Sequence, residues 1–452
     1  MNKVKLTGLA GIAAAAFIFI PTMTACTTDS ETSPPETTVV VDTSTFEKCL
    51  VAGTKNIKLN ITDDCTLGAD STYNLQGLTF VKFGTTLTIR EGATIKGKAD
   101  GSLTALIVEK GGIINAVGTA AKPIVFTAGT SAPVRSDFGG VVILGRAQLN
   151  VPTGSTDIEG LVGVPYGGTD ASDSSGVLQY VRIEYAGRLL GTDNELNGLT
   201  MGGVGSKTQI SYVHMREGLD DCFEWFGGSV SAHHLVATGC DDDMFDYDLG
   251  WVGTLQFALG AHVGVTNTDA NGIEADGRNG AEESLPRTAP SIANLTLIGT
   301  STGGGNSMNG MRLRRGVAGQ IYNSIVTGFG KGTVSGAAVR IDGNTSIRLV
   351  NNDSLKGHSI VAYNNGSRVN VSPAAGLTDS VATRAAAITK VGTWFHSDTT
   401  NLNITVASPK PTSTPTGTTL PSGKGFTPVT YIGAFDPAAA TLWTAGGWMR
   451  GY

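Results

Sequence analysis

The sequence predicts an all-β fold, a single-stranded parallel β-helix (solenoid) with capped ends. The first observation is composition, since 62 of the 452 residues are glycine and only 7% are aromatic. A Gly-, Thr- and Val-rich chain with little helical periodicity favours many short strands joined by turns. The second observation is that strand-like segments recur along the chain, and the third is that they share one order of apolar and polar positions.

Two short repeats come first. The segments "LTIREGATIKG" from Leu87 and "LIVEKGGIINA" from Leu106 superimpose at an offset of 19, and each has the pattern of a strand, a turn and a second strand. A strand that ends in glycine recurs later, for example in "LQYVRIEYAG" from Leu178 and "ISYVHMREG" from Ile210. We expect such copies to stack coil on coil, about 4.8 Å apart.

A third pattern lies between these copies and gives the coil length. It comprises "NGLTMG" from Asn197, "DCFEWF" from Asp221, "DMFDYD" from Asp243, "NGIEAD" from Asn271, "NGMRLR" from Asn309 and "AAVRID" from Ala337. Successive copies start 24, 22, 28, 38 and 28 residues apart, which fits one coil plus loops of varying size. A β-propeller blade would need four strands in each repeat and fits less well.

Stacking these copies assigns their faces, because successive side chains of a strand point to opposite sides. In "DMFDYD" the residues Asp243, Phe245 and Tyr247 fall on one side, which is apolar after its first member and is expected to face the core. The opening Asn or Asp of each copy then forms a column of Asn197, Asp221, Asp243, Asn271 and Asn309. We expect this column to be structural, since Asn and Asp tolerate unusual backbone angles at a corner.

The opposite side of the same strands carries charge. One outward column is predicted to hold Thr200, Glu224, Asp246, Glu274, Arg312 and Arg340, and its neighbour Phe226, Asp248, Asp276, Arg314 and Asp342. Like charges about 5 Å apart repel one another unless they are protonated, paired with arginine or bridged by a cation. The sequence therefore predicts an outward acidic face with arginines at its edge.

Three functions are compatible with this face. It can be a solvated surface whose acids simply pair with the arginines. It can bind a ligand through Asp248, Asp276, Arg312 and Arg314, with Phe226 and Trp251 as exposed stacking planes, and calcium is then expected at Asp246, Asp248, Glu274 and Asp276. It can also catalyse hydrolysis or elimination on a polysaccharide, with Glu224, Asp246 and Glu274 as the candidate acids.

The cysteines and histidines say less about function than the acidic face does. Cys49 and Cys65 are the better candidates for a disulfide, because they lie 16 residues apart near the start of the fold. Straight stacking puts Cys240 over Gly218, too far from Cys222 for a disulfide unless a turn intervenes. His214 and His234 are expected to stack outward beneath Arg182, with no third ligand for a metal. With 32 basic against 38 acidic residues, the chain lacks the positive charge that nucleic-acid binding needs.

The repeat resembles the right-handed β-helix of the pectate lyase and polygalacturonase superfamily. "DDC" at Asp220 is similar to the Asp-Asp pair of polygalacturonases, although "NTD" at Asn267 follows the pair here and precedes it in that family. A second resemblance, over residues 87–452, is to bacterial surface or outer-membrane β-helix lipoproteins with motifs like "GLDDCFEWFGG", "DDDMFDYDLGW" and "NGIEAD". Resemblance to that family implies a β-helix fold and a location at the bacterial surface, and the family has no established activity.

The two ends complete the expected organisation. Residues 1–25 have the charged start and apolar core of a secretory signal. Cys26 follows a small residue, as in a bacterial lipoprotein cleavage box. We expect a lipid on Cys26, anchoring to the outer membrane or cell surface, and a disordered tether over 26–45. The expected body has an N-terminal cap over 46–77, the β-helix over 78–406, a linker or long loop over 407–425 and a C-terminal cap over 426–452.

The sequence thus predicts a lipid-anchored protein that binds a carbohydrate or a cation-bridged ligand through its acidic face. Polysaccharide hydrolysis or elimination is the alternative, so the sequence leaves open whether the protein is an enzyme. The expected partners are a membrane, through the lipid, and a polysaccharide, and calcium is the one cofactor considered.

Overall fold

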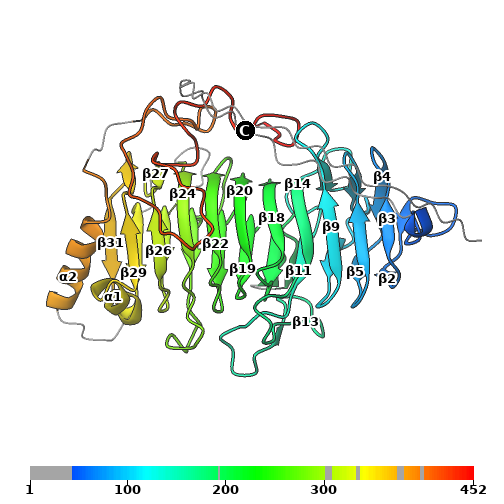
Figure 1. The fold of residues 1–452 in the computed structure, drawn as a ribbon, viewed down its shortest axis with the longest axis horizontal. Coiled ribbons are helices and arrows are strands. Elements are labelled where there is room, and N and C mark those ends of the chain that lie inside the picture. The colour runs from blue at the N-terminus through cyan, green and yellow to red at the C-terminus, as the bar shows by residue number, and fades with distance from the viewer. Residues whose placement is uncertain are drawn as a thin grey trace, which may run out of the picture. The chain divides into compact units, whose positions relative to one another are not determined.

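The computed structural model describes residues 43–451 apart from 192–193, 301–307, 332–335, 374–380 and 398–401. The expected signal, Cys26 and nearly all of the tether lie outside this range. The described strands form the predicted right-handed parallel β-helix (Figure 1). It is built from two long sheets, whose strands pair in parallel from coil to coil.

Sheet 1 has sixteen strands and covers two of the three sides of each coil. One path through it runs β1(Asn56–Ile57), β4(Thr72–Leu75), β7(Thr94–Lys96), β10(Ile124–Thr127), β14(Gly176–Glu184), β18(Gln209–Arg216), β20(Ser231–Thr238), β22(Thr254–Ala261), β24(Ser291–Ile298), β26(Gly319–Tyr322) and β29(Leu355–His358). The remaining five strands are β3(Cys65–Leu67), β6(Thr86–Ile89), β9(Ile113–Val117), β27(Ile325–Thr327) and β30(Val361–Tyr363).

Sheet 2 has eleven strands and forms the third side. It contains β2(Asn60–Ile61), β5(Leu78–Val81), β8(Ala105–Val108), β11(Val141–Leu144), β17(Leu199–Gly202), β19(Phe223–Phe226), β21(Phe245–Asp248), β23(Ile273–Ala275), β25(Met311–Leu313), β28(Val339–Asp342) and β31(Val369–Ser372). Two antiparallel hairpins leave the coils as insertions, β12(Thr156–Asp157) with β13(Pro165–Tyr166), and β15(Leu189–Gly191) with β16(Asn194–Glu195). The 3-10 turn η1(Thr43–Thr45) and helices α1(Asn344–Asn351) and α2(Val381–Gly392) complete the described elements.

The register of sheet 2 confirms the third repeat. Leu199 pairs with Phe223, Phe223 with Phe245 and Phe245 with Ile273, and the series continues through Met311 to Val339. The predicted superposition of Leu87 on Leu106 is wrong. Leu87 pairs with Ile114, because strands on different sides of one coil have the same alternation and a sequence match cannot tell these sides apart.

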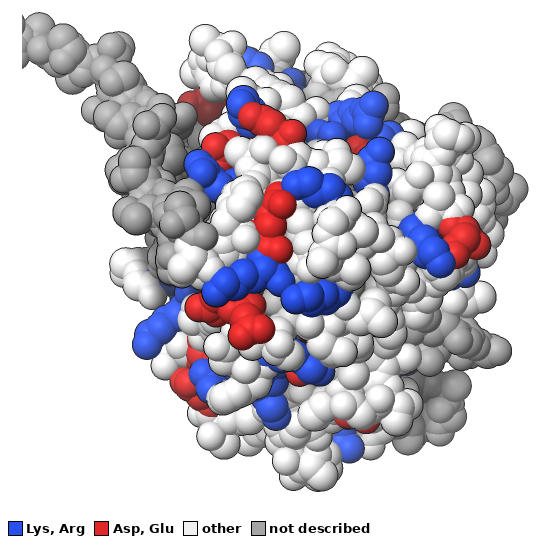
Figure 2. Space-filling model, turned by 90° about the vertical axis from the view of Figure 1, so that its right-hand side faces the viewer, with Lys and Arg blue, Asp and Glu red and all other residues white. Residues whose placement is uncertain are grey.

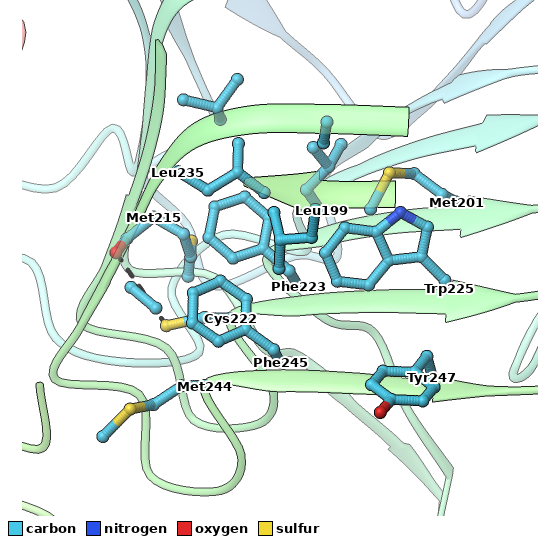
Figure 3. Close-up of a cluster of buried hydrophobic side chains, with 14 of the residues drawn as sticks. Leu199, Met201, Met215, Cys222, Phe223, Trp225, Leu235, Met244, Phe245 and Tyr247 are labelled. Carbon is cyan, nitrogen blue, oxygen red and sulfur yellow. Dashed lines mark hydrogen bonds between the residues drawn. The ribbon is translucent and has the colours of Figure 1, made fainter. Parts of the chain in front are cut away.

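The inward side chains of sheet 2 contribute several aromatic rings to the core (Figure 3). Phe223 stacks on Phe245 with ring centroids 5.6 Å apart, and Trp225 stacks on Trp251 at 4.8 Å. Phe245 is fully buried and Tyr247 is 2% exposed, as the alternation predicts. Burying rings of this size is a major stabilising contribution for a chain with few aromatics.

The ends of the solenoid differ from the expectation. Residues 46–77 already form β1 to β4, so the β-helix begins inside the predicted N-terminal cap. The Cys49–Cys65 disulfide is present there, as expected. At the other end the cover is helical, because apolar side chains of α1 and α2 join the main core and α2 contacts β31 (Figure 1).

The C-terminal segment is not an end cap, which corrects the prediction for residues 426–452. It runs lengthwise over the outer surface of sheet 1, where Thr427 O accepts from Gln256, Ala434 N–H donates to Thr296 and Gly447 O accepts from Arg182. Residues before it are held as well, since Asn323 binds Thr418 twice. The apolar side chains of this outer surface, rather than the open solenoid end, determine where the aromatic tail packs.

Charged side chains of both signs are interspersed on the end of the molecule that carries the first strands (Figure 2). Within the described residues, no helix is both long and apolar enough to cross a bilayer.

Candidate functional site

The corner before each strand of sheet 2 carries a ladder of hydrogen bonds. Asp243 N–H donates to Asp221 Oδ1 at 2.9 Å, Asn271 N–H to Asp243 Oδ1 at 2.5 Å, and Asn309 N–H to Asn271 Oδ1 at 3.1 Å. Ala337 N–H then donates to Asn309 Oδ1 at 3.1 Å. The predicted structural column is therefore confirmed from Asp221 to Asn309, although its side-chain oxygens bond the next coil rather than their own turn, and Asn197 Oδ1 accepts no hydrogen bond.

Replacing Asn309 tests the ladder away from the acidic face. Asn309→Ala leaves the buried Ala337 N–H without its acceptor, and we expect the free energy of unfolding to fall by about 2 kcal/mol. Asn115→Ala on β9 is the control, because that side chain points outward, and its effect should stay below about 0.5 kcal/mol. Urea unfolding measures both, and equal small losses would contradict a ladder that stabilises the fold.

The outward columns lie as predicted. Thr200 pairs with Glu224, Glu224 with Asp246 and Asp246 with Glu274, and the column continues to Arg312 and Arg340. In the second column Phe226 pairs with Asp248. Asp276 and Arg314 stand just past the ends of β23 and β25 and continue this column through backbone bonds to Tyr247 O and Ala275 O. The parallel register thus brings the candidate acids of three coils together.

The acids do not form the flat solvated face of the simplest interpretation. They line a cleft of 720 Å³, because chain insertions rise around the strands. Its described lining comprises Glu159, Glu195, Leu219, Asp220, Glu224, Phe226, Asp242, Asp246, Asp248, Asn267, Asp276, Asn279, Arg314 and Arg315. Glu224 is only 8% exposed and Asp276 only 7%.

Burial sets the protonation of these acids. It raises the pKa of Glu224, Asp246 and Asp248 well above the ordinary range, and repulsion by neighbouring carboxylates adds to each shift. Burial likewise raises the pKa of Asp242 to about 8 and that of Asp243 to about 7. A cleft with eight lining acids and two lining arginines has excess negative charge, which favours protons or bound cations.

The arginines hold one side of the cleft. Arg314 pairs with Glu274 and, at 2.6 Å, with Asp276. Arg312 pairs with Glu274 at 3.1 Å, and Arg315 pairs with Asp276. Burial still raises the pKa of Asp276, to about 6, against the opposing effect of Arg315. Glu274 and Asp276 are therefore compensated by protein cations.

Three groups of carboxylates have ligand atoms within 4.8 Å of one another. They are Asp220 with Asp221 and Asp242, Asp221 with Glu224 and Asp246, and Asp243 with Asp246 and Glu274. Two of the four expected calcium ligands, Asp246 and Glu274, meet in the third group. Asp248 and Asp276 belong to none of the three, because they lie one residue pair further along the strands.

Two expectations about exposed aromatic side chains differ from the structure. Trp251 is not an exposed stacking plane, since it is fully buried against Trp225 and donates its indole N–H to Val230 O at 2.9 Å. Gly250, with φ 94°, turns the chain inward there. Phe226 does line the cleft but is only 8% exposed. Stacking of a sugar on Trp251 is therefore excluded in this structure.

The Cys222–Cys240 disulfide, which straight stacking disfavours unless a turn intervenes, is present with Cα atoms 5.6 Å apart. The left-handed backbone at Glu217, with φ 56°, bends the chain so that Cys222 returns toward Cys240, which straight stacking could not foresee. Each cysteine adjoins an acidic segment, Asp220–Asp221 on one side and Asp241–Asp243 on the other. The disulfide therefore joins two segments that supply the cleft.

His214 lies beneath Arg182 as expected, but His234 does not, because Val236 takes the next position of that column. His234 instead stacks on Tyr212 at 4.5 Å. The register between β18 and β20 is constant, so His234 lies level with Tyr212, two positions before the column of His214.

Sequence reasoning missed Glu159, Glu195, Asp220 and Asp242 as cleft residues. Asp220 and Asp242 each lie one position before the start of a repeat copy, so the recurrence of two adjacent aspartates is a usable signal. Glu159 and Glu195 come from the two inserted hairpins, and no periodic pattern marks them.

A model of a known family, described as a pectate-lyase-like beta helix domain, matches residues 59–402. This span includes the cleft and nearly all of both sheets. Neither the curated proteins nor the solved structures contain a match to this chain. The register, the three-sided coils and the family match lead to one conclusion: the chain belongs to the family of pectate-lyase-like β-helix domains.

Proposed function

We propose that the cleft binds an acidic carbohydrate chain through a divalent cation. The observation that carries this proposal is the excess of carboxylates, eight of them in one cleft against two arginines. Asp246 and Asp248 each have a buried oxygen without a hydrogen-bond partner. Carboxylate oxygens are hard ligands, which suit Ca²⁺.

The arginine side supports an anionic group on the ligand. Arg315 has a side chain that is 34% exposed and uses one terminal nitrogen for Asp276, so other N–H groups of its guanidinium can reach a ligand carboxylate. A uronic acid carries both the carboxylate and the hydroxyls that a polar cleft with a bound cation can recognise. The cation then bridges protein acids and sugar acid.

Catalysis on the same chain is the second candidate. Burial raises the pKa of Asp246, whereas the adjacent Glu274 is paired with Arg312 and Arg314. A protonated acid beside an ionised one is the arrangement that glycoside hydrolysis uses. Asp246 would act as the acid and Glu274 as the nucleophile or base.

The proposal is tested by titrating oligouronates and matched neutral oligosaccharides into the protein, with calcium or with EDTA, in a calorimeter. We expect binding only of the oligouronates and only with calcium, and a roughly tenfold weaker affinity in Asp246→Asn, which removes a carboxylate shared by two of the three groups. Asp70→Asn, an exposed acid that forms a surface ion pair with Lys122, is the control and should bind normally. Equal binding in EDTA would contradict the proposal. Assays for new reducing ends and unsaturated products, with Asp246→Asn alongside, decide the catalytic candidate.

We also propose the location that residues 1–26 suggest, with a lipid on Cys26 holding the β-helix at a bacterial outer membrane or cell surface. A surface position would give the cleft access to polysaccharides outside the cell.

A further inference from the structure

A second and smaller pocket lies on sheet 1 instead of among the acidic strands of sheet 2. Its volume is 200 Å³, its floor comes from β20 and β22, and its wall is the part of the C-terminal segment over residues 424–427 (Figure 1). Gln256, 5% exposed, fixes this wall, because its Nε2 donates to Thr427 O at 2.9 Å and its Oε1 accepts from Thr427 N–H at 2.8 Å. These paired hydrogen bonds make the pocket a defined part of the fold.

Aromatic rings line both the floor and the wall of this sheet 1 pocket. In the floor, His234 stacks on Tyr212 at 4.5 Å, and its ring centroid lies 4.9 Å from that of Phe257. The backbone of His234, with φ 57°, interrupts the regular alternation of the strand, and His233 lines the pocket beside it. Phe426 lines the pocket from the wall and is partly buried. Rings on two sides favour a ring-shaped ligand over a lone ion.

The pocket carries one positive charge. Lys424 stands in the wall between Gly423 and Gly425, whose φ values are 79° and 76°. A Cβ at either glycine would meet no atom within 4 Å, so the backbone turn, and not crowding, favours glycine there. In the described part of the chain, Lys424 forms no ion pair and no acidic side chain lines the pocket. The sheet 1 pocket is therefore opposite in charge to the cleft and favours an anion.

The other polar groups of the pocket suit the hydroxyls of a sugar. Burial lowers the pKa of His234 to about 3 and also lowers that of His233, so both rings are neutral at pH 7 and can bond a hydroxyl. Ser231 Oγ accepts from Thr254 N–H at 3.1 Å, so its own O–H can donate to a ligand. The volume is below the range of about 300 to 1,000 Å³ that is usual for drug-sized ligands, so the pocket admits one ring and not a chain.

We propose that the sheet 1 pocket binds a single sugar unit that carries an anionic group, with Lys424 on the anion and Phe426 and His234 flanking the ring. This inference goes beyond the proposed function, because the pocket lies on the other sheet and needs no bridging cation. A lysine acts on an anion as a point charge, so carboxylate and phosphate both satisfy it.

The test titrates glucuronate, glucose 6-phosphate and glucose into the full-length protein in EDTA, in a calorimeter. EDTA removes the cation that the proposed function of the cleft requires. We expect a charged sugar to bind at least about tenfold more tightly than glucose, since only the charged sugars form the ion pair with Lys424. The comparison of the two charged sugars shows which anion the pocket prefers.

Four variants locate the binding. Lys424→Met should weaken the binding of the charged sugar by about tenfold or more, whereas Lys424→Arg keeps the charge and should lose less than about threefold. Phe426→Ala should lose about threefold or more, because it removes the ring of the wall. Lys98→Met is the matched control, since Lys98 is an exposed lysine outside the pocket, and it should bind normally.

Each outcome decides the inference. The expected losses in Lys424→Met and Phe426→Ala, with normal binding by Lys98→Met, support it. Normal binding by Lys424→Met or by Phe426→Ala overturns it, because the sugar would then lie elsewhere. Equal losses in Lys424→Met and Lys98→Met also overturn it, since net charge would explain both. A wild-type protein that binds neither charged sugar in EDTA overturns the inference and leaves the calcium-dependent function of the cleft intact.

Discussion

In EDTA, the melting temperature of the protein should fall as the pH rises from 5 to 8, and calcium should reverse this trend. The folded pKa values of Asp242, Asp243 and Asp276 are raised by burial to about 8, 7 and 6. From about pH 4 upward the unfolded chain loses these protons first, so the folded state holds more protons and loses stability until the pH passes the folded pKa values. Between pH 5 and 8 the metal-free protein therefore becomes progressively less stable.

The proposed cation would act in the opposite sense, because it would displace protons from carboxylates of the cleft and stabilise only the folded state. At a free concentration 100 times the dissociation constant the gain is about 2.7 kcal/mol. The gain should be larger at pH 8 than at pH 5, since protons compete with the metal. Scanning calorimetry over this pH range, with calcium or EDTA, measures it. A melting temperature that rises with pH in EDTA would refute the assigned burial of the acids.

Arg314→Met should be among the most destabilising single changes at the cleft, with a loss of about 3 to 4 kcal/mol in the free energy of unfolding at pH 7. Arg314 pairs with both Glu274 and Asp276, whose side chains are 11% and 10% exposed. Removing one partner of a buried ion pair leaves the other charge uncompensated in a poorly solvated place. Urea unfolding in EDTA measures the loss.

Two further variants distinguish the loss of charge compensation from a general loss of packing. Lys122→Met breaks a pair whose side chains are 55% and 56% exposed, and it should leave the free energy of unfolding nearly unchanged. Adding Glu274→Gln to Arg314→Met removes one stranded charge and should restore part of the stability. A double variant no more stable than Arg314→Met would point to lost packing instead of lost charge compensation.

The register of sheet 2 could be predicted because two signals coincide in each copy. The apolar positions Phe223, Phe245 and Ile273 specify which side faces the core, and the Asn or Asp before them marks the corner. A slip of one residue would turn every apolar side chain outward, so the pairing is strongly determined. The outward column that contains Glu224, Asp246 and Glu274 follows from this register alone.

The cleft could not be predicted from the same pattern. Its walls come partly from the inserted hairpins that carry Glu159 and Glu195, and loop paths depend on contacts that no periodicity encodes. The inward turn that buries Trp251 includes positive φ at Leu249 and Gly250, and the bend that precedes Cys222 includes positive φ at Glu217. A straight extrapolation of strand stacking misses both.

The sequence by itself determined the β-helix, the order of the coils and the gathering of acids on one side of sheet 2, because these depend on short-range alternation and spacing. Only the tertiary structure decided that the acids line a cleft instead of a solvated face, and which of them the arginines compensate. It also placed the C-terminal segment along sheet 1 instead of over the solenoid end. The physical reason is that burial and charge pairing depend on segments far apart in the chain, such as Asp276 and Arg314, which meet only when the coils stack.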